Sequence, residues 1–487
     1  MVKRFGDQPL GGGFFSTLRF EGEINDCEVD GEIPSDLHGT FYRLGGDWHH
    51  APKFPNDPPF SADGYISMFR FANGRVDYKG RFVRTPRFLA NQAAGRQLFG
   101  IYRNRLEDDP SVRSLNSTVA NTTPLIHAGK LFALKEDSKP FEIDPHTLET
   151  KGEYDFHGKY LSPTFTAHPK IDPVSGELIC FGYEAGGEAS DDLYFYTVDK
   201  TGHVTREVRI KTPYVAMVHD IAITQSHIVI PVCGLITSKE WLAAGNIHWA
   251  YDATLPSYVG ILPRDGDAKD LRWYKNPKGA AIHTLNAITE DNKLVLDAPV
   301  SDGNPFPFFE DLSGAPWDPQ LGMSTIRRWT FDLNAKDGGW QEENLFPTAF
   351  GGLGRIDDRF ASLPYQYAYM GYFDPQRPFD VLPKPGAPTF APNNMIGKFD
   401  MRSGKMESFF GGSTGSLQET CFVPKHRNAA EGEGYILSVY SNMVEKRSEL
   451  VILDAQTLEQ LARVIMPFQI SEQVHGAWAS HEEIPFA

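Results

Sequence analysis

Four histidines in apolar sequence contexts are the residues of this chain best suited to bind a metal. They occur in "SPTFTAHPKID", "VAMVHDIAIT", "GAAIHTLNAIT" and "SEQVHGAWAS", and they are His168, His219, His283 and His475. Neutral imidazoles are ligands for zinc, copper, iron and nickel. A closed tetrahedral set would hold structural zinc, whereas ferrous iron with two open positions would bind dioxygen. The spacing does not distinguish these two sites.

The separations between these histidines are 51, 64 and 192 residues, and 192 is three times 64. This spacing predicts one histidine per structural repeat, with two repeats passed between His283 and His475. For any single one of the four, a buried core histidine would be the better interpretation. Four histidines in phase with a repeat favour a shared site instead.

The repeat that must position them is visible as short β-rich runs that end in Asx or Gly turns. Seven such turns recur at steps of 54 to 71 residues, and they centre on Asn73, Asp144, Asp199, Asp265, Asp332, Asp400 and Asp454. Sheet repeats of this length are typical of propeller blades with four strands each. The alternative is a pair of irregular β-sandwiches. In a propeller the innermost strands line the axis, so we expect each histidine within such a strand.

Composition limits the partners of the chain. The 487 residues carry a net charge of -16, which argues against nucleic acid and anionic membranes. There is no apolar run of 18 residues, so we expect no membrane insertion. The four cysteines form no CxxC pair, and residues 1–15 lack the apolar core of a signal peptide. These features predict buried thiols in a cytoplasmic protein, and the absence of a linker predicts one domain over residues 1–487.

Several longer motifs resemble a known family. They are "GEIPSDLHGTFYRLGGD" at residues 31–47, "EDSKPFEIDPHTLET", "ETCFVPK" and the four histidine motifs. Together they resemble the carotenoid cleavage oxygenases, most of all the bacterial lignostilbene-cleaving members, over nearly the whole chain. The resemblance implies a seven-bladed all-β propeller, with a cap of loops and short helices over the axial metal site. It also implies one Fe(2+) per chain on the four histidines, and cleavage of an alkene with dioxygen into two carbonyl products.

The resemblance further implies carboxylates that accept hydrogen bonds from the outer ring nitrogens of the ligands. Glu136 and Glu419 match two of the family's three glutamates, and such partners orient the rings and offset the metal charge. The third position departs from the pattern, because "GGLGRIDDRF" places Gly352 where the family has an acidic residue. We expect water or a backbone carbonyl to replace that partner.

Three positions match the residues with which stilbene-cleaving members bind a 4-hydroxyphenyl ring: Phe60, Tyr102 and Lys135. Lys135 directly precedes Glu136, and strand alternation would send their side chains to opposite faces. A bulge or bend at the strand end would bring both inward. The aromatic loop "NPFPFFEDLSG" at residues 304–314 either walls the cleft or forms a dimer contact.

The leading hypothesis is an iron-dependent dioxygenase that cleaves the central double bond of a phenolic stilbene, with dioxygen as the second substrate. One alternative is an apocarotenoid-cleaving oxygenase on the same scaffold. Another, of a different class, is a propeller that serves as an interaction scaffold with structural zinc. A homodimer is compatible with each hypothesis.

Overall fold

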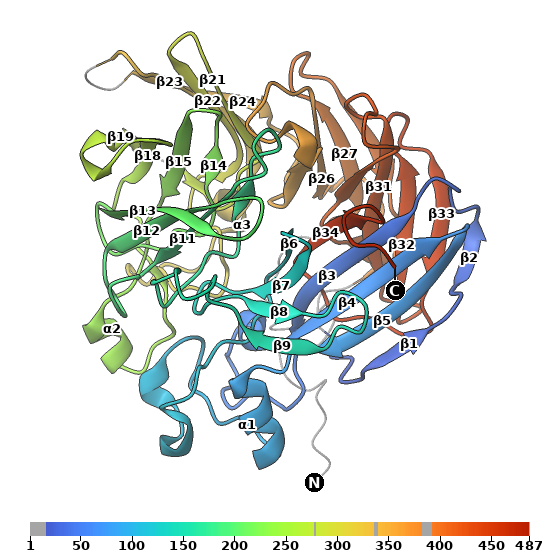
Figure 1. Ribbon diagram of the computed structural model, residues 1–487, viewed down its shortest axis with the longest axis horizontal. Helices are drawn as coiled ribbons and strands as arrows, with labels where there is room; N and C mark the ends of the chain where they lie inside the picture. Colours follow the sequence, from blue (N-terminus) through green and yellow to red (C-terminus); the bar gives the residue numbers. More distant parts are fainter. Residues whose placement is uncertain (1–15, 277–278, 336–338, 382–391, 487) are drawn as a thin grey trace.

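Seven antiparallel blades surround a central axis in this computed structural model, which describes residues 16–276, 279–335, 339–381 and 392–486 (Figure 1). Blades are numbered here in chain order, and strands are given from the axis outward. Blade 1 contains β34 (His475–Ser480), β3 (Gly39–Asp47), β4 (Asp63–Ala72), β5 (Arg75–Phe82) and β1 (Gly22–Ile24). Blade 2 contains β6 (Thr123–His127), β7 (Lys130–Leu134), β8 (Phe141–Ile143) and β9 (Thr150–Glu153). Blade 3 contains β10 (Lys170–Ile171), β11 (Leu178–Tyr183), β12 (Asp192–Val198) and β13 (Val204–Lys211).

The remaining four blades follow the same plan. Blade 4 contains β14 (Ala222–Ile223), β15 (His227–Val232), β18 (Ser257–Pro263) and β19 (Arg272–Asn276). Blade 5 contains β20 (Ala280–Ala281), β21 (Asn286–Glu290), β22 (Lys293–Ser301), β23 (Thr325–Asp332) and β24 (Trp340–Phe346). Blade 6 contains β25 (Gly354–Ile356), β26 (Tyr367–Tyr372), β27 (Met395–Asp400) and β28 (Met406–Phe410). Blade 7 contains β29 (Gly415–Leu417), β30 (Cys421–Pro424), β31 (Gly434–Asn442), β32 (Arg447–Asp454), β33 (Gln460–Ile465) and β2 (Glu28–Gly31).

The ring is closed by strands from both ends of the described chain. The C-terminal β34 pairs with the N-terminal β3 and brings Phe41 opposite Trp478. The N-terminal β2 pairs with β33 at the outer edge of blade 7. Each closing sheet therefore joins strands from distant parts of the described chain by backbone hydrogen bonds.

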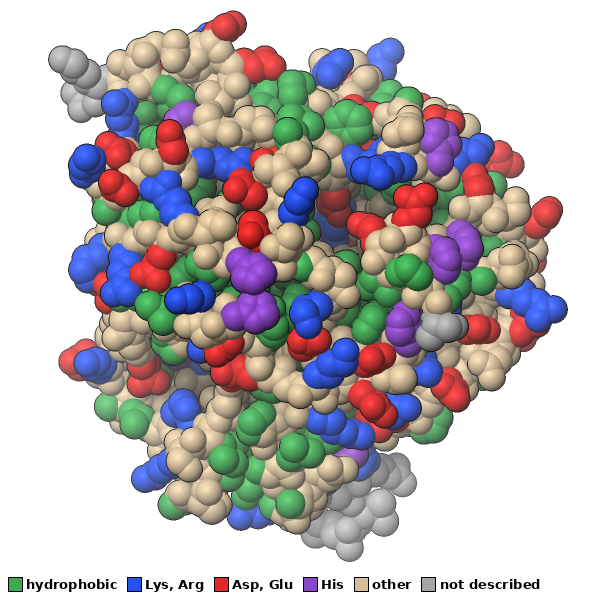
Figure 2. All heavy atoms as spheres, viewed as in Figure 1, with side chains coloured by type: hydrophobic (Ala, Val, Ile, Leu, Met, Phe, Trp, Pro, Cys, Tyr) green, Lys and Arg blue, Asp and Glu red, His purple; other side chains and the backbone are tan. Residues whose placement is uncertain are grey.

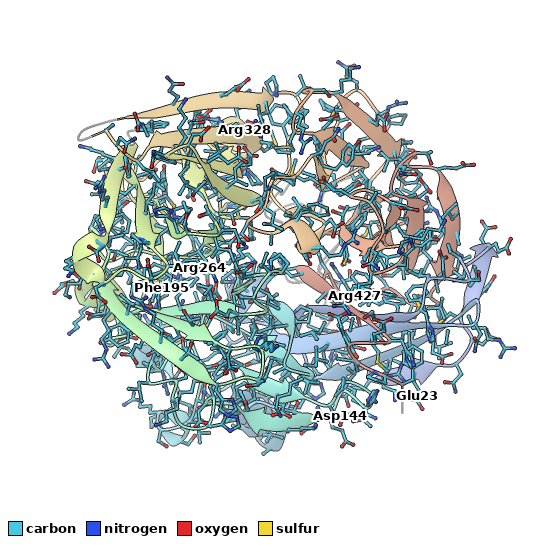
Figure 3. All side chains as sticks on the ribbon, turned by 45° about the horizontal axis from the view of Figure 1, so that its top comes forward. Glu23, Asp144, Phe195, Arg264, Arg328 and Arg427 are labelled. Carbon is cyan, nitrogen blue, oxygen red and sulfur yellow. The ribbon has the colours of Figure 1, made fainter. Side chains whose placement is uncertain are left out.

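In blades 2 to 6 the turns chosen from the sequence join the two outermost strands, and in blades 1 and 7 they join β4 to β5 and β32 to β33, just inside the added outer strands β1 and β2. In blade 2, for example, Oδ1 of Asp144 accepts hydrogen bonds from the N–H groups of His146 and Thr147, between β8 and β9. Figure 3 shows Asp144 at the periphery of the ring. Asn73 makes the corresponding turn in blade 1 in a left-handed conformation, with φ of 54°. The spacing of these turns therefore corresponds to the length of one blade, and the propeller prediction is confirmed.

The prediction that each histidine lies within an inner strand is wrong for three of the four. Only His475 begins a strand, whereas His168 and His219 precede the two-residue strands β10 and β14. His283 lies in the break between β20 and β21, which pair with the same neighbour, β22. A residue within a ladder would direct its side chain to one face of the blade. The inner strands are interrupted because these imidazoles must turn toward the axis instead.

The cap is made of segments inserted between strands. It includes α1 (Pro86–Ala94), α2 (Lys239–Ala243), α3 (Pro319–Gly322) and the small sheet of β16 (Leu235–Ile236) and β17 (Ala250–Tyr251). Helix α1 begins where Thr85 accepts a hydrogen bond from the N–H of Phe88, and it ends at Gly95 with φ of 65°. Nδ2 of Asn104 donates to the carbonyl of Leu242 within α2 at 2.9 Å and to the carbonyl of Asn246 after it at 2.7 Å. These contacts fasten the inserted segments to one another.

The surface and the thiols agree with the composition. Acidic and basic side chains are interspersed on the face shown in Figure 2, which is hollowed near its centre. All four cysteines are free and buried, as predicted. Among the described residues, no helix is long and apolar enough to cross a bilayer.

Closure of the ring gives the first prediction. Phe41 is fully buried in the cluster between blades 1 and 7, so Phe41→Ala should lower the free energy of unfolding by about 3–5 kcal/mol. Leu89→Ala on α1, where the side chain is 49% exposed, should change it by less than about 0.5 kcal/mol. Denaturant unfolding of both variants measures the difference. Equal losses of stability in the two variants would show that packing of Phe41 does not stabilise the closure of the ring.

Candidate metal centre

The four histidines selected by their spacing lie together at the axis. Their ligand nitrogens all lie within 4.8 Å of one another. Nε2 of His219 lies 3.0 Å from Nε2 of His168 and 3.2 Å from Nε2 of His283. Nε2 of His475 is buried and has no hydrogen-bond partner in the described part of the chain. Blades 1, 3, 4 and 5 each contribute one histidine, and blades 6 and 7 are passed between His283 and His475 as the spacing predicted.

Glutamates from blades 2 and 7, which contribute no histidine, hold two of the rings. Nδ1 of His219 donates to Oε1 of Glu136 at 2.6 Å, and Nδ1 of His475 donates to Oε1 of Glu419 at 2.8 Å. A neutral imidazole carries one proton, so a donating Nδ1 leaves the lone pair on Nε2. These bonds therefore orient both Nε2 atoms as electron-pair donors toward the axis.

Burial favours the neutral form of three of the rings, those of His168, His283 and His475. It lowers the pKa of His168 and of His283 well below the usual range, and the neighbouring histidines lower both further. Burial also lowers the pKa of His475, against the charge of Glu419. Converging lone pairs repel one another unless a cation lies between them. The donor set therefore fits a divalent transition metal, which neutral imidazoles bind.

Glu419 lies among positive charges. Its Oε2 accepts hydrogen bonds from the N–H of Gly476 at 2.8 Å and from Nη1 of Arg355 at 3.2 Å, and Nη1 of the buried Arg43 lies 3.7 Å away. Burial alone would raise the pKa of Glu419, but His475, Arg355 and Arg43 outweigh burial and lower this pKa to about 2. The carboxylate is therefore ionised at neutral pH and offsets the charge of a bound cation.

Asp220 links three histidine-bearing segments, and sequence reasoning missed it. Its carboxylate accepts hydrogen bonds from the N–H and hydroxyl of Thr284, at 2.8 and 2.9 Å, and pairs with Nζ of Lys170 at 2.8 Å. Lys170, Asp220 and Thr284 follow His168, His219 and His283 by two, one and one residues. The signal was a polar residue just after each histidine, but contacts between blades are not visible in a sequence.

Phe60, Tyr102 and Lys135 are also brought together, and they line one cavity. Nζ of Lys135 lies 5.7 Å from the ring centroid of Phe60 and 5.6 Å from that of Tyr102. Tyr102 and Lys135 are both 4% exposed. Glu136, the residue after Lys135, bonds His219, so the chain connects the lining of this cavity directly to the histidine centre.

Lys135 and Glu136 both point inward because the chain leaves the strand before them, which agrees with the bend expected at the strand end. Strand β7 ends at Leu134, so the alternation of side chains no longer applies to the two residues that follow. Nζ of Lys135 lies 3.8 Å from Oε2 of Glu136, and both side chains are buried. Burial alone would raise the pKa of Glu136, but Lys135 and the His219 hydrogen bond reverse this and hold it well below the usual range.

The aromatic loop between β22 and β23 packs against two of the residues that line this cavity, Phe60 and Tyr102. Phe306 and Phe308 meet the ring of Phe60 edge to face, with centroids 5.9 and 5.4 Å apart. Phe309 lies 5.8 Å from the ring of Tyr102. The loop is therefore tied to the cavity through Phe60 and Tyr102, and both roles expected for it, cleft wall and dimer contact, stay predictions.

Gly352 precedes β25 in blade 6 and leaves open space. A Cβ built at this position would meet no atom within 4 Å. Among the described residues, His219 and His475 pair with carboxylates through their outer nitrogens, and His168 and His283 do not. The missing third glutamate is therefore not replaced by another carboxylate in the part of the chain described.

Fold and site together define a class of protein: a seven-bladed propeller with a four-histidine metal centre on its axis. Lignostilbene-alpha,beta-dioxygenase isozyme III of Sphingomonas paucimobilis is 38% identical over 480 residues, which cover 98% of each chain. Isoeugenol monooxygenase of Pseudomonas putida is 40% identical over 479 residues, covering 97% of this chain and 98% of the relative. The crystal structure of lignostilbene dioxygenase from Pseudomonas brassicacearum matches with a TM-score of 0.94 at 37% identity, over 98% of this chain and 100% of that chain.

Residues 15–480 match the family described as retinal pigment epithelial membrane protein. The chain belongs to this family, the carotenoid oxygenases. The family resemblance of the motifs and the prediction of an oxygenase that cleaves carbon–carbon double bonds are thereby confirmed.

The setting of Glu419 gives the second prediction. Glu419→Gln should weaken metal binding by about 10–100-fold, because glutamine accepts the His475 hydrogen bond but no longer offsets the cation. Glu449→Gln is the matched control, since Glu449 is equally buried and pairs with Arg447 and Arg463. Metal titration with competing chelators should show a loss for the first variant only. Unchanged affinity in Glu419→Gln would reduce Glu419 to a structural residue.

Proposed function

We propose that this chain is an iron(II) dioxygenase that cleaves the central double bond of a 4-hydroxystilbene into two aromatic aldehydes. One alkene and one dioxygen balance the two aldehydes. The observation that carries the proposal is the buried Lys135, which lines a cavity with Phe60 and Tyr102. Lys135 also directly precedes the glutamate that bonds His219.

The names of the relatives support a phenolic substrate. Lignostilbene and isoeugenol are the compounds in the names of two relatives. Both compounds carry a 4-hydroxyphenyl ring conjugated to a carbon–carbon double bond. Two aromatic rings, a buried lysine and a hydroxyl are the groups that would recognise such a ring by stacking and by hydrogen bonding to its oxygen.

One ferrous iron per chain would be held by His168, His219, His283 and His475, with Glu136 and Glu419 behind His219 and His475. When bound, iron supplies the redox chemistry that activates dioxygen. Four protein ligands leave two positions of an octahedral ion for other groups. The ionised Glu136 and Glu419 would balance the two positive charges of ferrous iron.

Lys135 and Tyr102 would grip the 4-hydroxyl group of the substrate and favour its phenolate. Free phenols have a pKa near about 10, and a nearby ammonium in a dry site lowers it by about 1–3 units. Burial and the charge of Glu136 raise the pKa of Tyr102 well above its usual range, so its hydroxyl stays protonated and donates to the phenolate. Phe60 would stack on the ring. A para-phenolate pushes electron density into the alkene, which then reacts more readily with an oxidant.

The pair of Lys135 and Tyr102, called the clamp from here on, also argues against the apocarotenoid oxygenase and the zinc scaffold. The hydrocarbon chain of an apocarotenoid offers no acceptor to Lys135 and Tyr102, and unmet buried polar groups are costly. A closed zinc site in an interaction scaffold requires no such cavity. A single domain over residues 1–487, the cytoplasmic compartment and the homodimer stay predictions.

The metal assignment gives the third prediction. Purified protein should contain about one iron per chain, and His219→Ala should lose most of the iron and the activity, because removal of one of four ligands weakens binding and frees a position for water. His127→Ala, which removes a buried histidine of β6 outside the site, should keep both. Elemental analysis and hydroxystilbene turnover with labelled dioxygen measure these outcomes. Full activity with tightly bound zinc would contradict the assignment.

The clamp gives the fourth prediction. Lys135→Met keeps most of the side-chain volume but removes the charge, so it should lower kcat/KM for a 4-hydroxystilbene by about 10–100-fold while iron content stays unchanged. Lys130→Met at the start of β7, where Nζ pairs with Glu142 and the side chain is 36% exposed, is the control. The 4-methoxy analogue cannot ionise and should be a poor substrate of the parent enzyme. Equal parent rates on both substrates would refute the phenolate mechanism.

A further inference from the structure

A buried polar network lies directly behind Tyr102, and none of the motifs described above includes it. Nη2 of Arg103 donates to Oε2 of Glu184 at 2.9 Å, and Nη1 donates to the hydroxyl of Tyr183 at 2.8 Å. The side chains of Arg103 and Glu184 are 8% and 4% exposed. An ion pair this deeply buried is costly unless its remaining polar atoms are also bonded.

His248 completes the network and extends it to the backbone of Tyr102. Its Nε2 lies 2.9 and 3.0 Å from the two carboxylate oxygens of Glu184. Its own backbone N–H donates to the carbonyl of Tyr102 at 3.1 Å. On the other side, the N–H of Tyr102 donates to Oδ1 of Asp57 at 3.0 Å. Both backbone polar groups of Tyr102 are therefore held by buried partners.

Both ends of the ion pair have a left-handed backbone. The φ angle is 58° at Arg103 and 52° at Glu184, a conformation that residues with a Cβ seldom adopt. Such a backbone persists where the surrounding contacts determine it, and it is concentrated near functional sites. Here the hydrogen bonds between Arg103 and Glu184 join the two unusual residues to each other.

The network connects the cap to blade 3, and one of its members also lies near the charged Lys135. Glu184 directly follows β11 of blade 3, whereas Arg103 and His248 belong to cap segments before Arg105–Glu107 and before β17. Arg103 lines the same cavity as Lys135. The charge of Arg103 contributes to lowering the pKa of Lys135, after burial.

We propose that Glu184, Arg103 and His248 form a positioning network that holds the Tyr102 hydroxyl where it and Lys135 bind the same phenol oxygen. The network thereby determines the preference for 4-hydroxylated over 4-methoxylated stilbenes. This inference rests on the proposed function and deepens it.

The test is the selectivity ratio, which is kcat/KM for a 4-hydroxystilbene divided by kcat/KM for its 4-methoxy analogue. Glu184→Gln keeps the shape but removes the charge, and it should lower this ratio by about tenfold at unchanged iron content. Glu449→Gln, a buried glutamate with arginine partners far along the chain, should leave the ratio unchanged. Anaerobic titration with the hydroxystilbene adds a second readout, since phenolate formation shifts its absorbance to longer wavelength.

A double-mutant cycle separates positioning from a general structural role. In a Tyr102→Phe background there is no hydroxyl to position, so Glu184→Gln should lower the ratio no further. Should Glu184→Gln fail to fold, Tyr183→Phe removes one Arg103 hydrogen bond without changing volume. It should lower the ratio by about threefold, in the parent background only.

Two outcomes would overturn the inference while the proposed function stands. One is an unchanged ratio in Glu184→Gln and Tyr183→Phe, in a parent enzyme that prefers the hydroxylated substrate. The other is an equal loss with and without the Tyr102 hydroxyl. A parent enzyme with no preference for the hydroxylated substrate would overturn both the proposed function and this inference.

Discussion

The structure depends on the convergence of four imidazole lone pairs at one point on the axis. Neutral rings with facing lone pairs repel one another, and their burial prevents relief by protonation. The fold must therefore hold them against that repulsion until a cation joins them. Inner strands break where His283 and Glu419 turn inward, Asp220 ties neighbouring segments, and β34 closes the ring while supplying His475. Together these features hold the four rings at the axis.

The adjacent pair Lys135 and Glu136 joins the two halves of the site. Glu136 orients His219, while Lys135 faces the cavity with Phe60 and Tyr102. Because β7 ends at Leu134, two consecutive residues can both face inward, which a continuing strand would forbid. The charge of Lys135 lowers the pKa of Glu136. In turn, the charge of Glu136 raises the pKa of Lys135 and so opposes the lowering by burial. A change to either charge is therefore felt at both the clamp and the histidine centre.

Much of the fold could be predicted from the sequence. The seven Asx and Gly turns mark the outer hairpin of every blade, because a tight turn depends on local backbone preferences that a few residues encode. The in-phase histidines were found for the same reason, since a repeat in sequence becomes a repeat in space. The expected strand around His219 was wrong: the apolar stretch from Tyr214 to Thr224 forms only the short β14. Convergence at the axis outweighs the local preference for extended pairing.

The sequence by itself predicted the propeller repeat and the four histidines that meet at the axis, and the resemblance to the family added the predicted roles of Glu136, Glu419, Phe60, Tyr102 and Lys135. Turn chemistry and repeat spacing are local properties, and family motifs preserve residue types. Only the tertiary structure decided which groups share a charge environment: Asp220 with Lys170 and Thr284, Glu419 with Arg43 and Arg355, and Glu184 with Arg103 and His248. These partners lie up to 376 residues apart. Coulombic and hydrogen-bonding energies depend on distance in space, which chain separation does not reveal once seven blades close into a ring.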